Sequence, residues 1–242
     1  MQHADYHKTY DEGFFHRADG IDHWQRGKMR YGDAVATVAY ALGFTSWESV
    51  RDLFGCSILG KESNGDDRTA VQQIDALVRH QTRFPKSVLD VGGGRGEVAT
   101  AFVHAGVPKV QLVEPHAKGS EWFMQSLLKL FKMTVLGASV RFSNQTVPEC
   151  LGELELDDVD TVTFVESLEH IPEDCFQPFW DAVKPVLVKN KGMLIVANWI
   201  DYHPLLPTNA EHCRLVDDAL YERLAEGGTI MVRKGSHLVV QY

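Results

Sequence analysis

The residues between positions 90 and 96 have the types and spacing of a ligand-binding turn. The segment contains Asp90, Gly92, Gly94 and Gly96, and it follows a short β-branched run. Glycines let the main chain turn sharply and approach a ligand closely, because no Cβ intervenes. A dinucleotide fingerprint would need glycine or alanine at position 97, which is Glu97, and the Gly-Lys-Ser/Thr of a P-loop is absent. The segment therefore predicts a ligand-binding turn of another type.

An acidic residue follows at a distance that suits a ribose contact. Glu114-Pro115 ends the next strand-like run, and nucleoside-binding sheets place an acid about 20 residues after the glycine turn. A carboxylate at that place can accept hydrogen bonds from both hydroxyls of a ribose. Glu114 is therefore a candidate ribose ligand.

A second cluster of reactive side chains follows a β-branched run at 159–165. Glu166, Glu169 and His170 project together if this stretch forms a helical turn. His170 could act as a general base that a neighbouring carboxylate orients. Alternatively, the three side chains could ligate a divalent metal that acidifies a substrate hydroxyl. In a third interpretation, Glu166 faces solvent or substrate and the other two only cap the next helix. The residues alone leave these three roles open.

The elements that must position these residues alternate between strand and helix after Pro85. Strands are expected at 87–91, 110–113, 140–142, 159–165 and 193–197, and helices at 97–104, 120–131, 172–188 and 215–225. We expect Pro178 and Pro185 to interrupt or kink the helix at 172–188. The segments on either side of Gly235 have the alternation of a β-hairpin. This order predicts a mostly parallel sheet with helices on both faces and an antiparallel hairpin at one edge.

Residues 1–83 have a different sequence pattern, which indicates helices and contains no convincing strand. Apolar residues recur at near-helical spacing between positions 22 and 42, and again between 69 and 80. Thr45 with Glu48 has the form of a capping box. We therefore expect a helical N-terminal cap over 1–83 and a separate domain over 84–242.

Composition and charge narrow the function classes. The chain has 242 residues, 44% of them hydrophobic, and a net charge of −9. That charge disfavours a nucleic-acid-binding protein with a broad basic surface. No apolar run approaches the about 18 residues of a membrane span. The four cysteines form no CxxC pair, which is typical of reduced thiols and favours a cytoplasmic protein.

Three segments in this order, DVGGGRG, LVEP and VESLEHI, resemble motifs of the class I S-adenosylmethionine-dependent methyltransferases. The resemblance covers about residues 84–242. It implies an α/β fold with a Rossmann-like, doubly wound, mostly parallel seven-stranded sheet that ends in an antiparallel hairpin. The α-helical cap would precede this sheet.

The resemblance also implies a set of residues that bind S-adenosyl-L-methionine. They are Asp90, Gly92, Gly94, Gly96, Glu114, Pro115, Asn144 and Gln145. The glycines would line the methionine portion, and Asp90 would steady the turn or the amino group. Glu114 would hold the ribose hydroxyls. Asn144 or Gln145 would contact adenine, at a place where family members often have aspartate.

The ExxEH element within VESLEHI is similar to two narrower families. One comprises the ubiquinone-pathway catechol O-methyltransferases. The other comprises the small-RNA 3′-terminal 2′-O-methyltransferases, whose metal site uses two Glu and two His. In the second comparison the metal ligands are Glu166, Glu169, His170 and His212, with His203 competing for the fourth place. Without a metal, His170 and Glu166 would be the catalytic residues.

The cap has its own counterpart in small-molecule methyltransferases, which the chain resembles. Their N-terminal helices fold over the cofactor and form a substrate lid that excludes water. The aromatic candidates for such a lid are Tyr6, Tyr10, Phe14, Phe15, Trp24 and Tyr31. The alternative is that these aromatic residues only pack the added helices against the sheet.

The resemblance implies an enzyme that transfers a methyl group from S-adenosyl-L-methionine to a small organic acceptor, with oxygen favoured by the metal alternative. A metal-dependent RNA 3′-terminal 2′-O-methyltransferase is the alternative that ExxEH favours and the acidity disfavours. A non-catalytic binding partner with this fold is a further option, although it would not need an intact glycine turn. The expected partner is a small-molecule substrate, with neither nucleic acid nor membrane, and a homodimer is left open.

Overall fold

The protein was analysed as a computed structural model that describes residues 85–94, 96–104, 107–116, 138–165, 167–197, 214, 216–234 and 237–242. The cap expected over 1–83 and the helix expected at 120–131 lie outside these ranges. Two candidate site residues, Glu166 and His212, also lie outside them.

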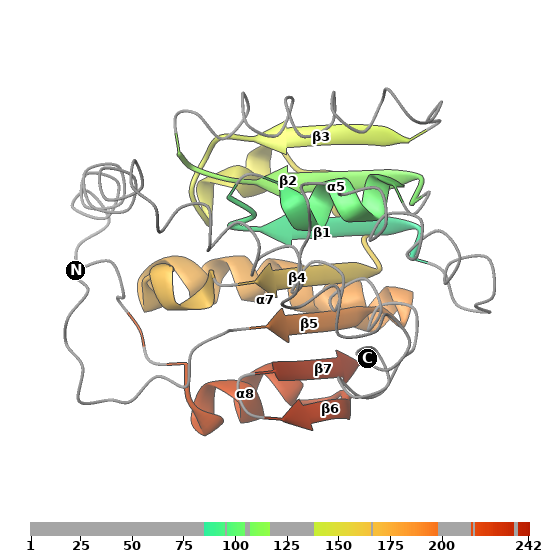
Figure 1. Ribbon diagram of the computed structural model, residues 1–242. Coiled ribbons are helices and arrows are strands. Elements are labelled where there is room, and N and C mark those ends of the chain that lie inside the picture. The colour runs from blue at the N-terminus through green and yellow to red at the C-terminus, as the bar shows by residue number, and fades with distance from the viewer. Residues whose placement is uncertain are drawn as a thin grey trace, which may run out of the picture.

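A seven-stranded sheet forms the centre of the fold, with the order β3-β2-β1-β4-β5-β7-β6 (Figure 1). The strands are β1 Ser87–Val91, β2 Lys109–Val113, β3 Ser139–Ser143, β4 Thr161–Val165, β5 Met193–Ala197, β6 Thr229–Lys234 and β7 His237–Gln241. All pairs from β3 to β5 are parallel, whereas β7 is antiparallel to both β5 and β6. The predicted mostly parallel sheet with a terminal hairpin is therefore confirmed.

The strand order reverses between β1 and β4, and this reversal places the site. The chain moves outward from β1 through β2 to β3, then returns to the other side of β1 with β4 and β5. In open α/β sheets, ligands bind outside the carboxyl ends of the strands at such a switch point. The residues that follow β1, β2, β3 and β4 therefore meet at one edge of the sheet.

The central strands are buried along almost their whole length. Every residue of β1 is buried, and so are the first four residues of β4. Helices cover both faces of these strands, as expected for a parallel sheet of β-branched runs. Within β1 the buried charge is Asp90, which has no exposed surface. A buried charge requires hydrogen-bond partners, and those of Asp90 are described with the candidate functional site below.

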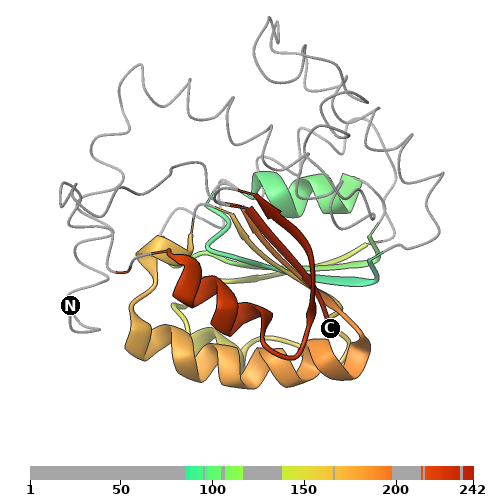
Figure 2. The same cartoon turned by 90° about the horizontal axis from the view of Figure 1, so that it is seen from below.

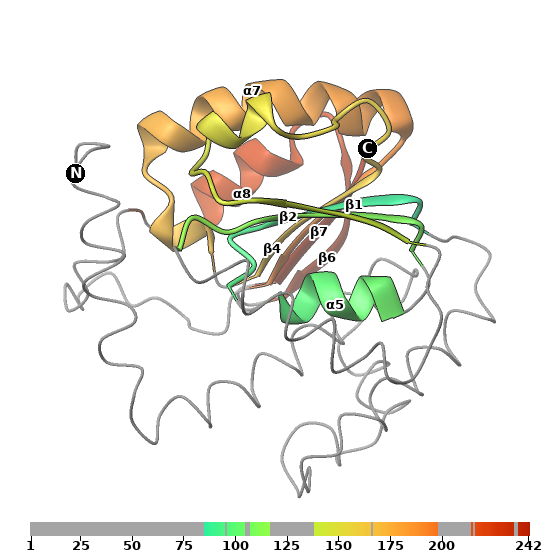
Figure 3. The ribbon, with the colours of Figure 1, turned by 90° about the horizontal axis from the view of Figure 1, so that it is seen from above.

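Helices lie on both faces of the sheet. Helices α7 (Glu173–Asn190) and α8 (Asp218–Ala225) cover one face, and α5 (Glu97–His104) lies on the opposite face (Figures 2 and 3). Helix α8 begins later than the predicted position 215, because the Asp217 side chain accepts a hydrogen bond from the Leu220 N–H at 2.9 Å and so forms the N-cap. In the described parts of the chain, no helix is long and apolar enough to cross a membrane.

Helix α7 is continuous through Pro178 and Pro185, so the predicted interruption is wrong. Both prolines are exposed and lie on the solvent side of the helix, about two turns apart. Each lacks the N–H that would bond to the carbonyl four residues earlier, at Asp174 and Asp181. Those carbonyls can bond to water on the solvent side, where long helices are convex. Exposure therefore lets the helix tolerate both residues.

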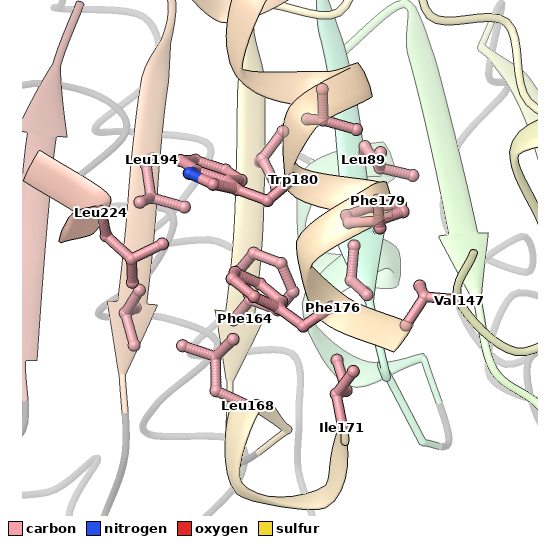
Figure 4. Packing of buried hydrophobic residues seen from close by; sticks show 14 of the residues in the cluster. Leu89, Val147, Phe164, Leu168, Ile171, Phe176, Phe179, Trp180, Leu194 and Leu224 are labelled. Atoms are coloured by element: carbon pink, nitrogen blue, oxygen red, sulfur yellow. The ribbon is translucent and has the colours of Figure 1, made fainter. Parts of the chain in front are cut away.

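The core between the sheet and α7 contains a group of aromatic side chains among aliphatic ones (Figure 4). Phe164 of β4 meets Phe176 of α7 edge to face, with ring centroids 5.9 Å apart. Phe176 in turn stacks on Trp180 at 6.0 Å. All three side chains are buried. This packing fixes the end of β4 and the start of α7, so the short connection between them is held at both ends.

Glu173, at the start of α7, is expected to make stability depend on pH. Its carboxylate accepts hydrogen bonds from Arg223 at 2.6 and 3.1 Å and pairs with Arg214 at 2.9 Å. The hydrogen bonds from Arg223 and the charge of both guanidinium groups lower the pKa of Glu173. A group whose pKa is lower in the folded state stabilises the fold above its unfolded pKa, and that contribution disappears as pH falls through the folded pKa.

The melting temperatures of wild type and Glu173→Gln are therefore expected to differ at about pH 7 and to converge toward about pH 3. Thermal unfolding followed by circular dichroism at both pH values measures this. A difference that stays constant from neutral to acid pH would contradict the role of the ion pairs.

Candidate functional site

The glycine turn after β1 has a backbone conformation that favours glycine. Gly92, Gly94 and Gly96 have φ angles of +68°, +56° and +76°, which residues other than glycine rarely adopt. The N–H groups of Gly92 and Gly93 both donate to the carbonyl of Val113, at 2.8 and 3.2 Å. The turn is therefore fastened to the end of β2, beside Glu114.

Close packing makes glycine necessary at two positions of this turn. A Cβ on Gly92 would come within 2.6 Å of the Ser167 Cβ. A Cβ on Gly93 would come within 2.5 Å of the Asp90 Oδ2 and closer still to Leu112. Gly93 was not among the predicted site residues, because its role depends on a contact with β2 that no local pattern records.

Asp90 joins three elements beneath the turn. Its carboxylate accepts a hydrogen bond from the Thr163 hydroxyl at 2.6 Å and another from the Ala99 N–H at 3.2 Å. Ala99 is the third residue of α5, so its N–H has no partner within the helix. A carboxylate is also favourable near the N-terminus of a helix. Asp90 therefore holds β1, β4 and α5 together, which gives a physical basis for the prediction that it steadies the turn.

Thr163 is a site residue that sequence reasoning missed. It pairs with Asp90 in the register of the β1–β4 ladder, and that register places its hydroxyl against the buried carboxylate. A threonine in a β-branched run is ordinarily explained by strand propensity. The signal available in the sequence was Asp90 itself, since a buried acid needs donors.

Glu114 is held from two sides at the end of β2. One carboxylate oxygen accepts the Gly94 N–H at 2.7 Å, and the other accepts the His116 N–H at 2.9 Å. The side chain has no exposed surface. An ionised carboxylate only accepts hydrogen bonds, and both of its oxygens do so here. The backbone thus orients this acid in advance of a ligand.

Asn144 and Gln145 follow β3 at the same edge and differ in how they are used. The amide nitrogen of Asn144 donates to the carbonyls of Glu114 at 2.8 Å and His116 at 2.7 Å. Both of its hydrogens are thereby committed to tying the loop after β3 to the loop after β2. Gln145 is exposed. Asn144 is exposed too, but because its amide hydrogens bond to these two carbonyls, Gln145 is the one of the two predicted adenine contacts that we expect to offer an amide donor.

Glu169 and His170 lie shortly after β4 in the short 3-10 turn η4 (Leu168–His170). Both side chains are buried, and the His170 Nε2 is 3.9 Å from a Glu169 carboxylate oxygen. The Glu169 carbonyl accepts the Arg214 N–H at 3.3 Å, so the chain returns to this turn after β5. Glu169 and His170 are therefore placed beside one another, near the glycine turn that Ser167 contacts.

The metal alternative finds no support in the described part of the chain. Among those residues, no group of three or more His, Cys, Asp or Glu side chains could hold a metal ion. Glu166 and His212, the other two proposed ligands, lie outside the described residues. Glu169 and His170 alone make only two of the four ligands that the ExxEH resemblance implies.

The position of β7 distinguishes this sheet from the dinucleotide-binding fold. The latter has the strand order 3-2-1-4-5-6, whereas here the antiparallel β7 lies between β5 and β6. This difference agrees with the absence of a dinucleotide fingerprint at the glycine turn.

No protein-family model matches the sequence, and no curated protein matches it. Several solved structures do align with this chain. An O-methyltransferase family protein from Burkholderia thailandensis aligns with a TM-score of 0.50 and 14% identity, over 86% of this chain and 67% of that one. The small RNA methyltransferase HEN1 aligns with a TM-score of 0.51 and 16% identity, over 70% of this chain and 24% of that one.

The chain has the fold of the class I methyltransferases. The resemblance predicted from the three motifs is thereby confirmed at the level of the fold. The chain spans only about a quarter of the HEN1 protein, and at these identities the likeness describes architecture. The residues at the carboxyl edge must therefore carry any argument about chemistry.

Proposed function

We propose that this chain transfers the methyl group of S-adenosyl-L-methionine to a small organic acceptor, at an oxygen atom. The observation that carries the proposal is Glu114, a fully buried carboxylate whose two oxygens are fixed by backbone N–H groups at the switch point of the sheet. A carboxylate at this place in the fold is the type of acceptor that the paired hydroxyls of a ribose require. In this proposal residues 84–242 form the cofactor-binding domain.

The donor would lie along the carboxyl edge from β4 to β3. Gly92, Gly94 and Gly96 would line its methionine portion, because the turn presents backbone without side chains. Glu114 and Pro115 would hold the ribose. The adenine would lie near Gln145, with Asn144 shaping the loop beneath it.

In this proposal the methyl group passes directly from donor to acceptor, so the protein forms no covalent bond with either. The methyl carbon is already activated by the sulfonium, so the protein contributes mainly alignment of acceptor and donor. The acceptor oxygen forms a bond to the methyl carbon, the carbon–sulfur bond breaks, and S-adenosylhomocysteine leaves. His170 would take the proton of the acceptor hydroxyl, with Glu169 beside its ring and Glu166 close in sequence. Residues 1–83 would form the lid that selects the acceptor.

A second candidate is a metal-dependent methyltransferase that acts on the 3′-terminal 2′-hydroxyl of RNA. The ExxEH element and the structural likeness to the small RNA methyltransferase HEN1 favour it. The net charge of −9 disfavours it, because RNA phosphates need basic partners. In this candidate, Glu166, Glu169, His170 and His212 would hold the metal. A non-catalytic binding protein with the same fold is a third candidate, which the intact glycine turn disfavours.

A methyl-uptake panel tests these candidates. The purified chain is incubated with methyl-labelled S-adenosylmethionine and with phenols, organic acids, amines or RNA 3′ ends, each with and without EDTA. We expect label in a small hydroxylated acceptor, undiminished by EDTA. Uptake by RNA alone, abolished by EDTA and restored by a divalent ion, would contradict the proposal and establish the second candidate. Absence of uptake by every acceptor, in a protein that binds the donor, would favour the non-catalytic candidate.

A further inference from the structure

Ser167 is a buried residue at the carboxyl end of β4 to which neither the predictions nor the proposed mechanism gives a role. It has 3% of its surface exposed and immediately precedes the η4 turn. Its Cβ fills the space that a side chain at Gly92 would need, and its Oγ lies 3.3 Å from the place where a Gly92 Cβ would be. The hydroxyl therefore faces the first glycine of the turn.

The hydroxyl of Ser167 has no hydrogen-bond partner among the residues that the structure describes. It precedes η4 as the N-cap residue, yet its side chain makes no capping bond, whereas its carbonyl accepts the His170 N–H at 3.1 Å. Burying a hydroxyl without a partner is unfavourable, and native proteins rarely do so. The position therefore calls for a partner that the described protein atoms do not supply.

The other buried serine and threonine residues in the described part of the chain show that this is unusual for the fold. They are Ser87, Ser143, Thr146, Thr161 and Thr163. Each of these donates to a carboxylate. Ser167 differs from all of them in position as well, because it lies against the turn to which we assign the methionine portion of the donor.

We propose that the Ser167 hydroxyl is a ligand contact that donates a hydrogen bond to the carboxylate at the amino-acid end of S-adenosylmethionine. This inference rests on the proposed function, since it assigns a partner within the same donor site. The donor's carboxylate is a charged acceptor, and a hydrogen bond to it satisfies the orphaned hydroxyl. Ser167 would then discriminate nucleosides that carry the amino-acid portion from those that lack it.

The test uses two ligands that differ in the group concerned. S-adenosylhomocysteine carries the amino-acid portion, whereas 5′-methylthioadenosine has the same adenosine and a thioether without it. Calorimetry on the full chain compares wild type, Ser167→Ala and Ser87→Ala. Ser87 is the matched control, because it is a buried serine on the same sheet whose hydroxyl bonds to Asp158 at the opposite edge. Thermal unfolding of each variant verifies that it is folded.

We expect Ser167→Ala to lower the affinity for S-adenosylhomocysteine about 10- to 100-fold and to leave that for 5′-methylthioadenosine within about twofold of wild type. Ser87→Ala should leave both affinities at the wild-type value. Equal losses for both ligands in Ser167→Ala would overturn the proposal in favour of a structural role. Unchanged affinity for S-adenosylhomocysteine, with or without a change in the KM of an acceptor, would overturn it too. Failure of the wild type to bind S-adenosylhomocysteine would overturn the proposed function as well.

Discussion

Replacing Glu114 by glutamine is expected to lower the affinity of the chain for S-adenosylhomocysteine at least about 100-fold, because two charge-assisted bonds to the ribose are lost. The substitution also disturbs the protein side of the site. Both carboxylate oxygens accept backbone N–H groups, from Gly94 and His116. An amide must turn its NH₂ group toward one of those donors, so the turn is pushed away from β2. Isothermal titration calorimetry measures the effect.

Glu155→Gln is the matched control for this experiment. It removes the same charge from an exposed position where the carboxylate pairs with Lys109 and Arg141, away from the carboxyl edge. Its affinity should equal that of wild type. If Glu114→Gln bound S-adenosylhomocysteine as tightly as the control does, the assignment of Glu114 to the ribose would be wrong.

Replacing Asp90 by asparagine is expected to lower the free energy of unfolding by about 2–4 kcal/mol. The side chain has no exposed surface, and its two oxygens accept from Thr163 and Ala99. An asparagine can accept from one of these donors only, and its NH₂ group then faces the other. The start of α5 also loses a negative charge that its N-terminus favours. Urea unfolding gives the free energy, and an unchanged m-value would verify that the transition remains two-state.

A double-mutant cycle with Thr163→Val measures how much of this loss in unfolding free energy comes from the contact between Asp90 and Thr163. Since valine removes the donor that Asp90 faces, the combined loss in Asp90→Asn/Thr163→Val should be smaller than the sum of the single losses by about 0.5 kcal/mol or more. Additive losses would mean that the contact between Asp90 and Thr163 contributes nothing to stability. A loss below about 0.5 kcal/mol in Asp90→Asn alone would contradict the role of this carboxylate as a junction.

Features that depend on neighbours along the chain could be predicted from the sequence. The run that ends in Gly92 and Gly94 indicated both the strand β1 and a sharp turn after it, and the positive φ angles of these glycines agree with that turn. Helix α5 and strand β5 also have the predicted bounds. The order of strands and helices then placed Glu114 at the edge where the turn lies.

Features that depend on contacts between distant segments could not be predicted from the sequence. The pairing of Asp90 with Thr163 requires the register of β1 on β4, and the two bonds of Asn144 require the loops after β2 and β3 to be side by side. Ser167 looks like an ordinary residue between two acids until Gly92 is seen against it. The exposure of Pro178 was likewise needed to explain why it does not break α7.

The wild-type arm of the calorimetric titration tests the central claim most directly. The claim is that the carboxyl edge formed by Gly92, Gly94 and Glu114 binds the nucleoside of a methyl donor. We predict saturable binding of S-adenosylhomocysteine at one site per chain, with S-adenosylmethionine competing for it and both raising the melting temperature. A full-length, folded chain that takes up neither ligand and gains no thermal protection from them would contradict the account.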